Sequence, residues 1–144
     1  MIHACPISSR RIDANTVRMS ALFTALSALL LLTTHHPLFL LLLAFDFSMR
    51  LWRKNRLSPF ALAGGALLRF AHVPPRMSDE APKRFALQLG WSMIVVMTAA
   101  FVVHLAIITY VLGTILLLCA AAEALFEYCV GCRIYRYIEY FRKR

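Results

Sequence analysis

The stretch "FALQLGWSMIVVMTAAFVVHLAIITYVLGTILLLCAAA", residues 85–122, is apolar along its whole length apart from Gln88, His104 and a few hydroxyl side chains. A single helix crosses the roughly 30 Å of membrane hydrocarbon with about 20 residues. The run is about twice as long as one crossing requires. It therefore predicts two transmembrane helices, residues 85–103 and 105–128, joined near His104.

Two more apolar runs precede this stretch. The sequence "VRMSALFTALSALLLLTT" predicts a transmembrane helix over residues 17–34. After "HHP" a second run, "LFLLLLAFDFSMRLW", predicts a helix over residues 37–52, because proline suits the first turn of a helix but cannot continue one.

A shorter apolar segment, "SPFALAGGALLRFAH", covers residues 58–72. As a helix it spans only about 22 Å, and it contains Gly64, Gly65 and Arg69. We expect it to lie along the membrane interface between the two pairs of helices. A re-entrant hairpin at the glycine pair is the alternative.

The composition of the chain agrees with a membrane protein. Of its 144 residues 60% are hydrophobic, and the mean hydropathy of +0.67 is far above that of a soluble domain. The net charge of +9 would suggest nucleic acid in a soluble chain. Here the cations flank apolar runs, as they do where they meet lipid headgroups, so a nucleic-acid partner is discounted. We expect one all-α, polytopic membrane domain, with four transmembrane helices arranged as two hairpins.

The lysines and arginines gather in three parts of the chain: residues 10–18, 50–84 and 133–144. The turns at residues 35–37 and at His104 contain none. The positive-inside rule then predicts that both termini and the central segment are cytoplasmic and that the two turns face outward.

The stretch "FEYCVGCRIY" places Cys129 and Cys132 at the predicted cytoplasmic end of the last helix. Thiols on that side are kept reduced, so a permanent disulfide is not expected. Two cysteines at this spacing suit dithiol redox chemistry, and they equally form half of a soft-metal site that Cys5 would extend. The third interpretation is simple packing at the end of a helix.

The charge state of these thiols depends on where the last helix ends. If the helix continues, Arg133 and Arg136 follow the two cysteines by one turn and favour thiolates. The dipole of a helix C-terminus acts in the opposite direction. A helix that ends at Gly131, followed by a second, interfacial helix, would remove this conflict.

Acidic residues occur in two of the predicted helices. Asp46 has Arg50 four residues later as its natural partner, with Arg18 as a second candidate, and we favour a salt bridge over a proton-carrying role. Glu123 and Glu127 lie one turn apart, on a different face from the cysteines if the helix is continuous. The acids and the thiols therefore need not share a pocket. An arginine of the central segment is the expected partner of Glu123, and proton acceptance beside the dithiol is the alternative.

Six short stretches carry a family resemblance: "CPIS" from Cys5, "RRID" at 10–13, "FDFSMR" at 45–50, "SPFA" at 58–61, "APKRFA" at 81–86 and "EALFEYCVGCRIY" at 123–135. Over nearly its whole length the chain resembles the bacterial membrane proteins catalogued as domain of unknown function 4395. The resemblance implies a bacterial inner-membrane protein, similar in layout to the DoxX-like four-helix proteins, some of which are linked to thiol, thiosulfate or quinone chemistry. This chain has Glu127 where the family pattern has glycine, and an acid there would raise the pKa of a neighbouring thiol.

These observations predict a cytoplasm-facing dithiol that exchanges electrons or sulfane sulfur with a soluble thioredoxin- or rhodanese-like protein. One thiolate attacks the partner's disulfide or persulfide and the other resolves the mixed species. A quinone between the helices is the expected electron sink. The alternatives are a soft-metal (Zn, Cu or Hg) binding or transport protein, with the outward histidines at 35, 36 and 104 as an entry point, and a structural membrane subunit. The residues assigned to the site are Cys129, Cys132, Cys5, Arg133, Arg136, Glu123, Asp46 and Arg50.

Overall fold

The computed structural model describes residues 11–52 and 55–143 of the chain. The described part is almost entirely helical, as the apolar runs predict, with one small two-stranded sheet. The elements in chain order are β1 (Arg11–Asp13), α1 (Ala14–Thr34), α2 (Pro37–Leu51), the short 3-10 helix η1 (Asn55–Leu57), α3 (Pro59–Phe70), β2 (Met77–Asp79), α4 (Glu80–Val102), α5 (Ala106–Phe126) and α6 (Val130–Arg142).

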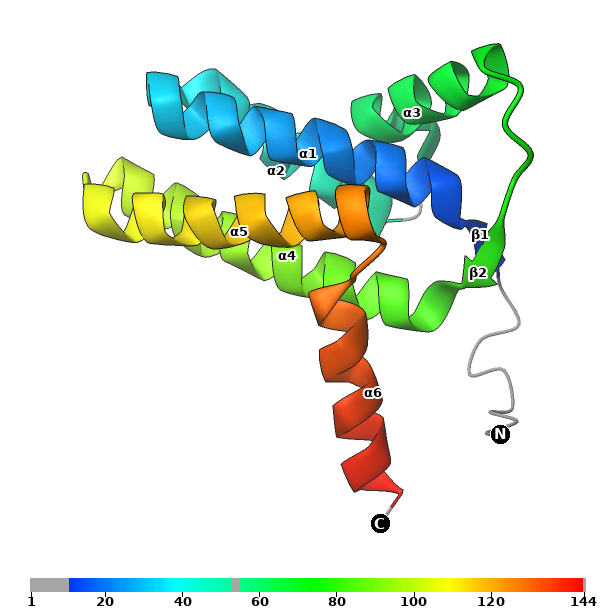
Figure 1. Ribbon diagram of the computed structural model, residues 1–144. Helices are drawn as coiled ribbons and strands as arrows, with labels where there is room; N and C mark the ends of the chain where they lie inside the picture. The colour runs from blue at the N-terminus through cyan, green and yellow to red at the C-terminus, as the bar shows by residue number, and fades with distance from the viewer. Residues whose placement is uncertain (1–10, 53–54, 144) are drawn as a thin grey trace.

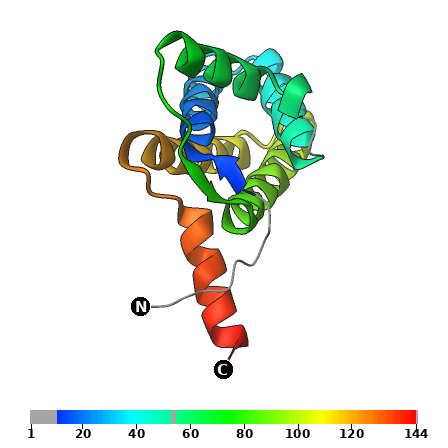
Figure 2. The same cartoon turned by 90° about the vertical axis from the view of Figure 1, so that its right-hand side faces the viewer.

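Helices α1, α2, α4 and α5 form a four-helix bundle (Figure 1). Helix α1 packs on α2 and α5, and α4 packs on the same two helices. Seen along the bundle axis, the four helices surround a common centre, with α3 outside α1 (Figure 2). Helices α1 and α2 are joined by a short turn at His35, and α4 and α5 by one at His104. Both turn residues have positive φ angles, so the two predicted hairpins and their turns are present.

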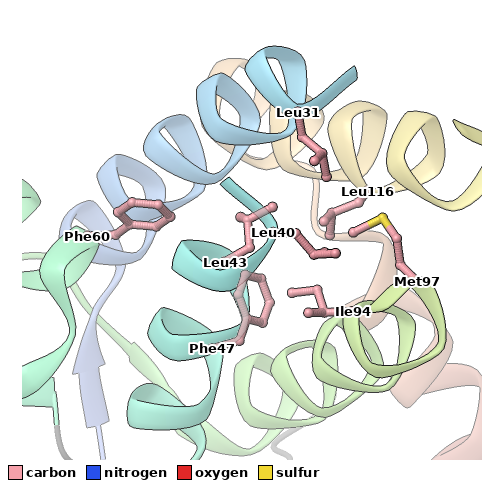
Figure 3. Close-up of a cluster of buried hydrophobic side chains, with 8 residues drawn as sticks. All are labelled: Leu31, Leu40, Leu43, Phe47, Phe60, Ile94, Met97 and Leu116. Carbon is pink, nitrogen blue, oxygen red and sulfur yellow. The ribbon is translucent and has the colours of Figure 1, made fainter. Parts of the chain in front are cut away.

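A cluster of eight buried apolar side chains fills the centre of the bundle (Figure 3). The outer surface is apolar as well, since large aliphatic side chains such as Leu38, Val102 and Ile107 are exposed. An apolar exterior of this extent suits contact with lipid. The buried cluster consists of Leu31, Leu40, Leu43, Phe47, Phe60, Ile94, Met97 and Leu116.

Among residues 11–52 and 55–143, three helices are long and apolar enough to cross a membrane: α1, α4 from Ala81 onward, and α5. Helix α2 matches the prediction for residues 37–52 within one residue. Its 15 residues correspond to about 22 Å, which is less than the roughly 30 Å of membrane hydrocarbon. A fourth crossing through α2 therefore stays a prediction.

Helix α3 confirms the predicted helix at residues 58–72 and runs without a break through its two glycines. The chain therefore does not turn back at the glycine pair. The helix lies antiparallel on the first half of α1, where Phe60 stacks on Phe23 with 6.1 Å between ring centroids and Gly64 faces Met19.

Two features of the chain segments at one end of the bundle were not predicted. Strands β1 and β2 form an antiparallel pair that the all-α prediction did not contain. They are only three residues long, too short for an alternating pattern to be visible in sequence. Helix α4 also begins at Glu80 rather than at residue 85, because its first turn is polar and carries no hydrophobic signal.

Replacing Gly64 with alanine is expected to destabilise the protein by about 1–3 kcal/mol. The added Cβ would lie 2.9 Å from the Cβ of Met19, an atom that cannot rotate away. Gly65 is the matched control, because a Cβ there meets nothing within 4 Å and alanine is the better helix former by about 1 kcal/mol. Unfolding in mixed micelles titrated with dodecyl sulfate measures both free energies. Equal effects at the two positions would contradict the packing of α3 on α1.

Candidate functional site

Helices α1 and α4 begin and α5 ends at the same end of the bundle (Figure 1). Residues from this end line a cavity of about 460 Å³. Thiols, acids and cations meet around it, although they come from distant parts of the sequence. The lining residues that carry this chemistry are Arg18, Arg76, Lys83, Glu123, Glu127, Cys129, Cys132, Arg133 and Arg136.

The cysteine pair begins a helix instead of ending one. Helix α5 ends at Phe126, so the prediction of a helix over residues 105–128 is wrong at its C-terminal end. Glu127 adopts a left-handed conformation with φ 54°, and the Tyr128 N–H donates to the Ala122 carbonyl at 3.2 Å. Such a residue ends a helix and reverses the chain. The conformation is the one that glycine adopts most easily.

Cys129 is the N-cap residue of α6. Its sulfur accepts a hydrogen bond from the Cys132 N–H at 3.3 Å. The predicted break near Gly131 therefore occurs a few residues earlier, and Gly131 lies inside the first turn of α6. At a helix N-terminus the free N–H groups and the helix dipole favour a thiolate. The expected conflict with the dipole does not arise.

A hydrogen bond between the two thiols shifts their pKa values in opposite directions. The Cys129 thiol donates to the Cys132 sulfur, and this lowers the pKa of Cys132 and raises that of Cys129. Burial acts against ionisation of Cys132, and so does Glu123, while Lys83 and Arg136 favour it. The two thiols therefore titrate as a coupled pair, in which Cys132 is the one that ionises first.

The two glutamates share the cavity with the thiols, although a continuous helix would have placed them on a different face. Glu123 forms an ion pair with Lys83, and both side chains are largely buried. Glu127 pairs with Arg18 at 2.7 Å and with Arg76 at 3.1 Å. The partner of Glu123 is thus a lysine and not the arginine that the sequence suggested.

Asp46 and Arg50 lie outside this cavity. The predicted salt bridge is present, with 2.8 Å between Asp46 Oδ2 and Arg50 Nη2, whereas Arg18, the second candidate, pairs elsewhere. Asp46 is fully buried, and its Oδ1 accepts hydrogen bonds from the Ser58 hydroxyl and the Phe60 N–H. The carboxylate therefore joins α2 to the first turn of α3.

The remaining predicted residues have different surroundings. Arg136 lines the cavity, and the Arg133 guanidinium, which also lines it, lies 4.8 Å from the centre of the Tyr128 ring. Cys119 is in α5 away from the cavity. Cys5 lies outside the described residues. Within residues 11–52 and 55–143, no three His, Cys, Asp or Glu side chains come together as metal ligands.

Two functional cations were missed by sequence reasoning. Strand pairing brings Arg76 to the start of α1, where its carbonyl accepts from the Ala14 N–H at 2.7 Å. Lys83 belongs to "APKRFA", one of the stretches that carried the resemblance. A Cβ built on Gly131 would lie 2.5 Å from the Cβ of Ala86, so this stretch and "CVGC" pack directly on each other. The joint occurrence of "APKRFA" and "CVGC" in the sequence was the signal that could have placed Lys83 near the cysteine pair.

The fold and the site define a helical protein with three candidate membrane spans and a C-x-x-C pair in a cation-lined cavity. A family model described as Domain of unknown function (DUF4395) matches residues 12–139. The chain therefore belongs to this family, which confirms the resemblance seen in the sequence. Neither a search of curated proteins nor a search of solved structures found a match. The DoxX-like layout stays a prediction.

Proposed function

We propose that this protein exchanges disulfides with a soluble thioredoxin-like protein through Cys129 and Cys132. The observation that carries the proposal is the position of the pair at the first turn of α6, where the Cys132 N–H donates to the Cys129 sulfur. Lys83 and Arg136 stabilise the negative charge on Cys132. The cavity at the end of the bundle leaves room for a partner's sulfur atoms.

The proposed topology is a bacterial inner-membrane protein with four crossings, α1, α2, α4 and α5, and with both termini in the cytoplasm. The cations around the cavity all lie at one end of the bundle. The two turns at the other end contain histidine but no lysine or arginine. This asymmetry supports a cytoplasmic location for the cavity.

The proposed reaction begins with the Cys132 thiolate, which attacks one sulfur of the partner's disulfide. A bond forms between Cys132 and that sulfur, and the partner's other sulfur leaves as a thiolate and takes up a proton. Cys129 then loses its proton and attacks the Cys132 sulfur, and the partner's first sulfur leaves as a thiolate. Two electrons pass to the partner, and this chain keeps a Cys129–Cys132 disulfide. The relative reduction potentials of the two proteins set the direction of exchange.

A persulfide on a rhodanese-like partner would react at the same sulfur. Cys132 would accept the sulfane sulfur and become a persulfide, while the partner keeps its thiol. Attack by Cys129 would then close the disulfide and release hydrosulfide. The cations around the cavity would stabilise the anionic persulfide.

The full chain with Cys5→Ser and Cys119→Ser is expected to form a reversible disulfide in defined dithiothreitol buffers. Labelling with a gel-shift maleimide counts the free thiols of this variant. Their number should fall from two to zero as the buffer becomes oxidising and should return to two on reduction. Adding Cys129→Ser or Cys132→Ser should abolish the transition. Protection of the thiols by Zn(II) or Cu(I) without a reversible disulfide would instead favour metal binding. Thiols that respond to neither treatment would favour a structural role.

A further inference from the structure

Helix α6 leaves the bundle at the level where a candidate span ends. Only residues 127–129 separate it from α5. In both views α6 projects sideways from the bundle and does not continue its axis (Figures 1 and 2). Because α5 is one of the three candidate spans, a helix that leaves its end sideways begins at the surface of the membrane.

One face of α6 is apolar and exposed. Successive residues of a helix are turned by about 100°, so Ile134, Tyr137, Ile138 and Phe141 share a face. Between 42% and 66% of each of these residues is exposed, and α6 has no buried residue at all. An apolar surface of this kind on a basic helix is typical of helices that lie in the membrane interface.

The position of the cavity shows which way this face points. Cys132 and Arg136, on the opposite side of α6, line the cavity together with Arg76 and Met77. Arg76 directly precedes β2 and Met77 is its first residue, at the end of the bundle where α1 and α4 begin. The apolar face of α6 is therefore turned away from that end, toward the lipid-facing sides of the spans.

Contacts with α4 hold this orientation. Gly131 packs against Ala86, where a larger side chain would clash, and the Tyr135 ring lies 5.5 Å from that of Phe85. These two contacts fix the rotation of α6 about its own axis. The apolar face consequently follows from the packing of the bundle.

We propose that α6 is an in-plane anchor for a membrane surface that carries anionic lipids. The apolar face lies among the acyl chains, about 5–10 Å below the headgroups. Residues 130–143 contain four cations and one acid, Glu139, which pairs with one of the cations at 3.8 Å. Cations near an anionic surface each favour binding. They are Arg133, Arg136, Arg142 and Lys143.

Tryptophan placed on the two faces of α6 tests this arrangement. Phe141→Trp and Lys143→Trp are matched variants, since the positions are two residues apart on opposite faces and both side chains are exposed. The full-length variants are reconstituted in phosphatidylglycerol vesicles with brominated acyl chains. The fluorescence of the introduced tryptophan is obtained by subtracting the emission of the parent chain. Its quenching by the brominated lipid should be about threefold or more stronger at position 141 than at position 143, because only the apolar face reaches the acyl chains.

Varying the lipid charge and the protein concentration shows whether lipid or a second copy of the chain covers the apolar face of α6. In phosphatidylcholine vesicles the tryptophan at 141 should become about twofold more accessible to aqueous acrylamide, because the attraction of the cations is lost. Equal quenching by brominated lipid at both positions would overturn the proposal. Shielding of position 141 that grows with protein concentration in detergent, without lipid, would overturn it as well and assign the face to a second copy of the chain.

Discussion

Replacing Asp46 with alanine is expected to destabilise the protein by about 3–5 kcal/mol, because the Arg50 charge would remain buried without its partner. The carboxylate is fully buried, and only 14% of the Arg50 side chain is exposed. The substitution also removes the acceptor of the Ser58 hydroxyl and the Phe60 N–H. Titration with dodecyl sulfate in mixed micelles measures the loss.

Two comparisons show whether burial causes this effect. Glu139→Ala removes another acid that pairs four residues along a helix, but its partner Lys143 is largely exposed. The expected loss there is below about 1 kcal/mol. The double variant Asp46→Leu with Arg50→Leu removes both buried charges and should recover about 1–2 kcal/mol of the single-variant loss. A double variant as unstable as Asp46→Ala would show that the hydrogen bonds to α3 dominate.

The core of the fold follows from the hydrophobic pattern. The run at residues 85–122 is too long for one helix, and the polar residue His104 lies at its middle, so the pattern predicts both helices and their turn. Proline at 37 locates the second helix in the same way. The sheet and the first turn of α4 escape detection, because short polar segments owe their structure to neighbours that are distant in sequence.

The cavity depends on one backbone feature that the hydrophobic pattern does not show. Glutamate rarely adopts a positive φ angle, so Glu127 gives no sign that the helix ends before it. A continuous helix places Glu123 on a different face from the thiols, whereas the actual break brings them together. The one available sign was the resemblance, which implies a glycine at this position. The same break gives Cys129 its N-cap position.

The pH dependence of thiol alkylation reports directly on this local geometry. Only the thiolate reacts with iodoacetamide, so the rate rises with pH around the pKa of the reacting sulfur. Cys132 has a lowered pKa because Cys129 donates a hydrogen bond to it. Its rate is therefore expected to reach half its maximum below the pH at which an ordinary cysteine does. Removing the donor with Cys129→Ala should move that midpoint to higher pH.

Two matched arginine variants show whether the pKa of Cys132 depends on one nearby charge or on the total charge of α6. Arg136→Gln should also raise the midpoint, because this guanidinium helps to lower the pKa of Cys132. Arg133→Gln is the control, since that side chain lies over the Tyr128 ring. A shift of the same size in both variants would show that the total charge of the helix, and not the position of Arg136, tunes the thiol.

Replacing Cys132 with serine is expected to produce the largest loss of reactivity, about tenfold or more in the alkylation rate at pH 7. The remaining thiol in the cavity, Cys129, has no lowered pKa of its own, so it should stay protonated at that pH. The measurement uses the full chain with Cys5→Ser and Cys119→Ser, so that one thiol reports. Cys129→Ser in the same background should keep the faster rate, because Lys83 and the first turn of α6 still favour the Cys132 thiolate. The opposite ranking would make Cys129 the attacking thiolate and would reverse the roles of the two sulfurs in the proposed exchange.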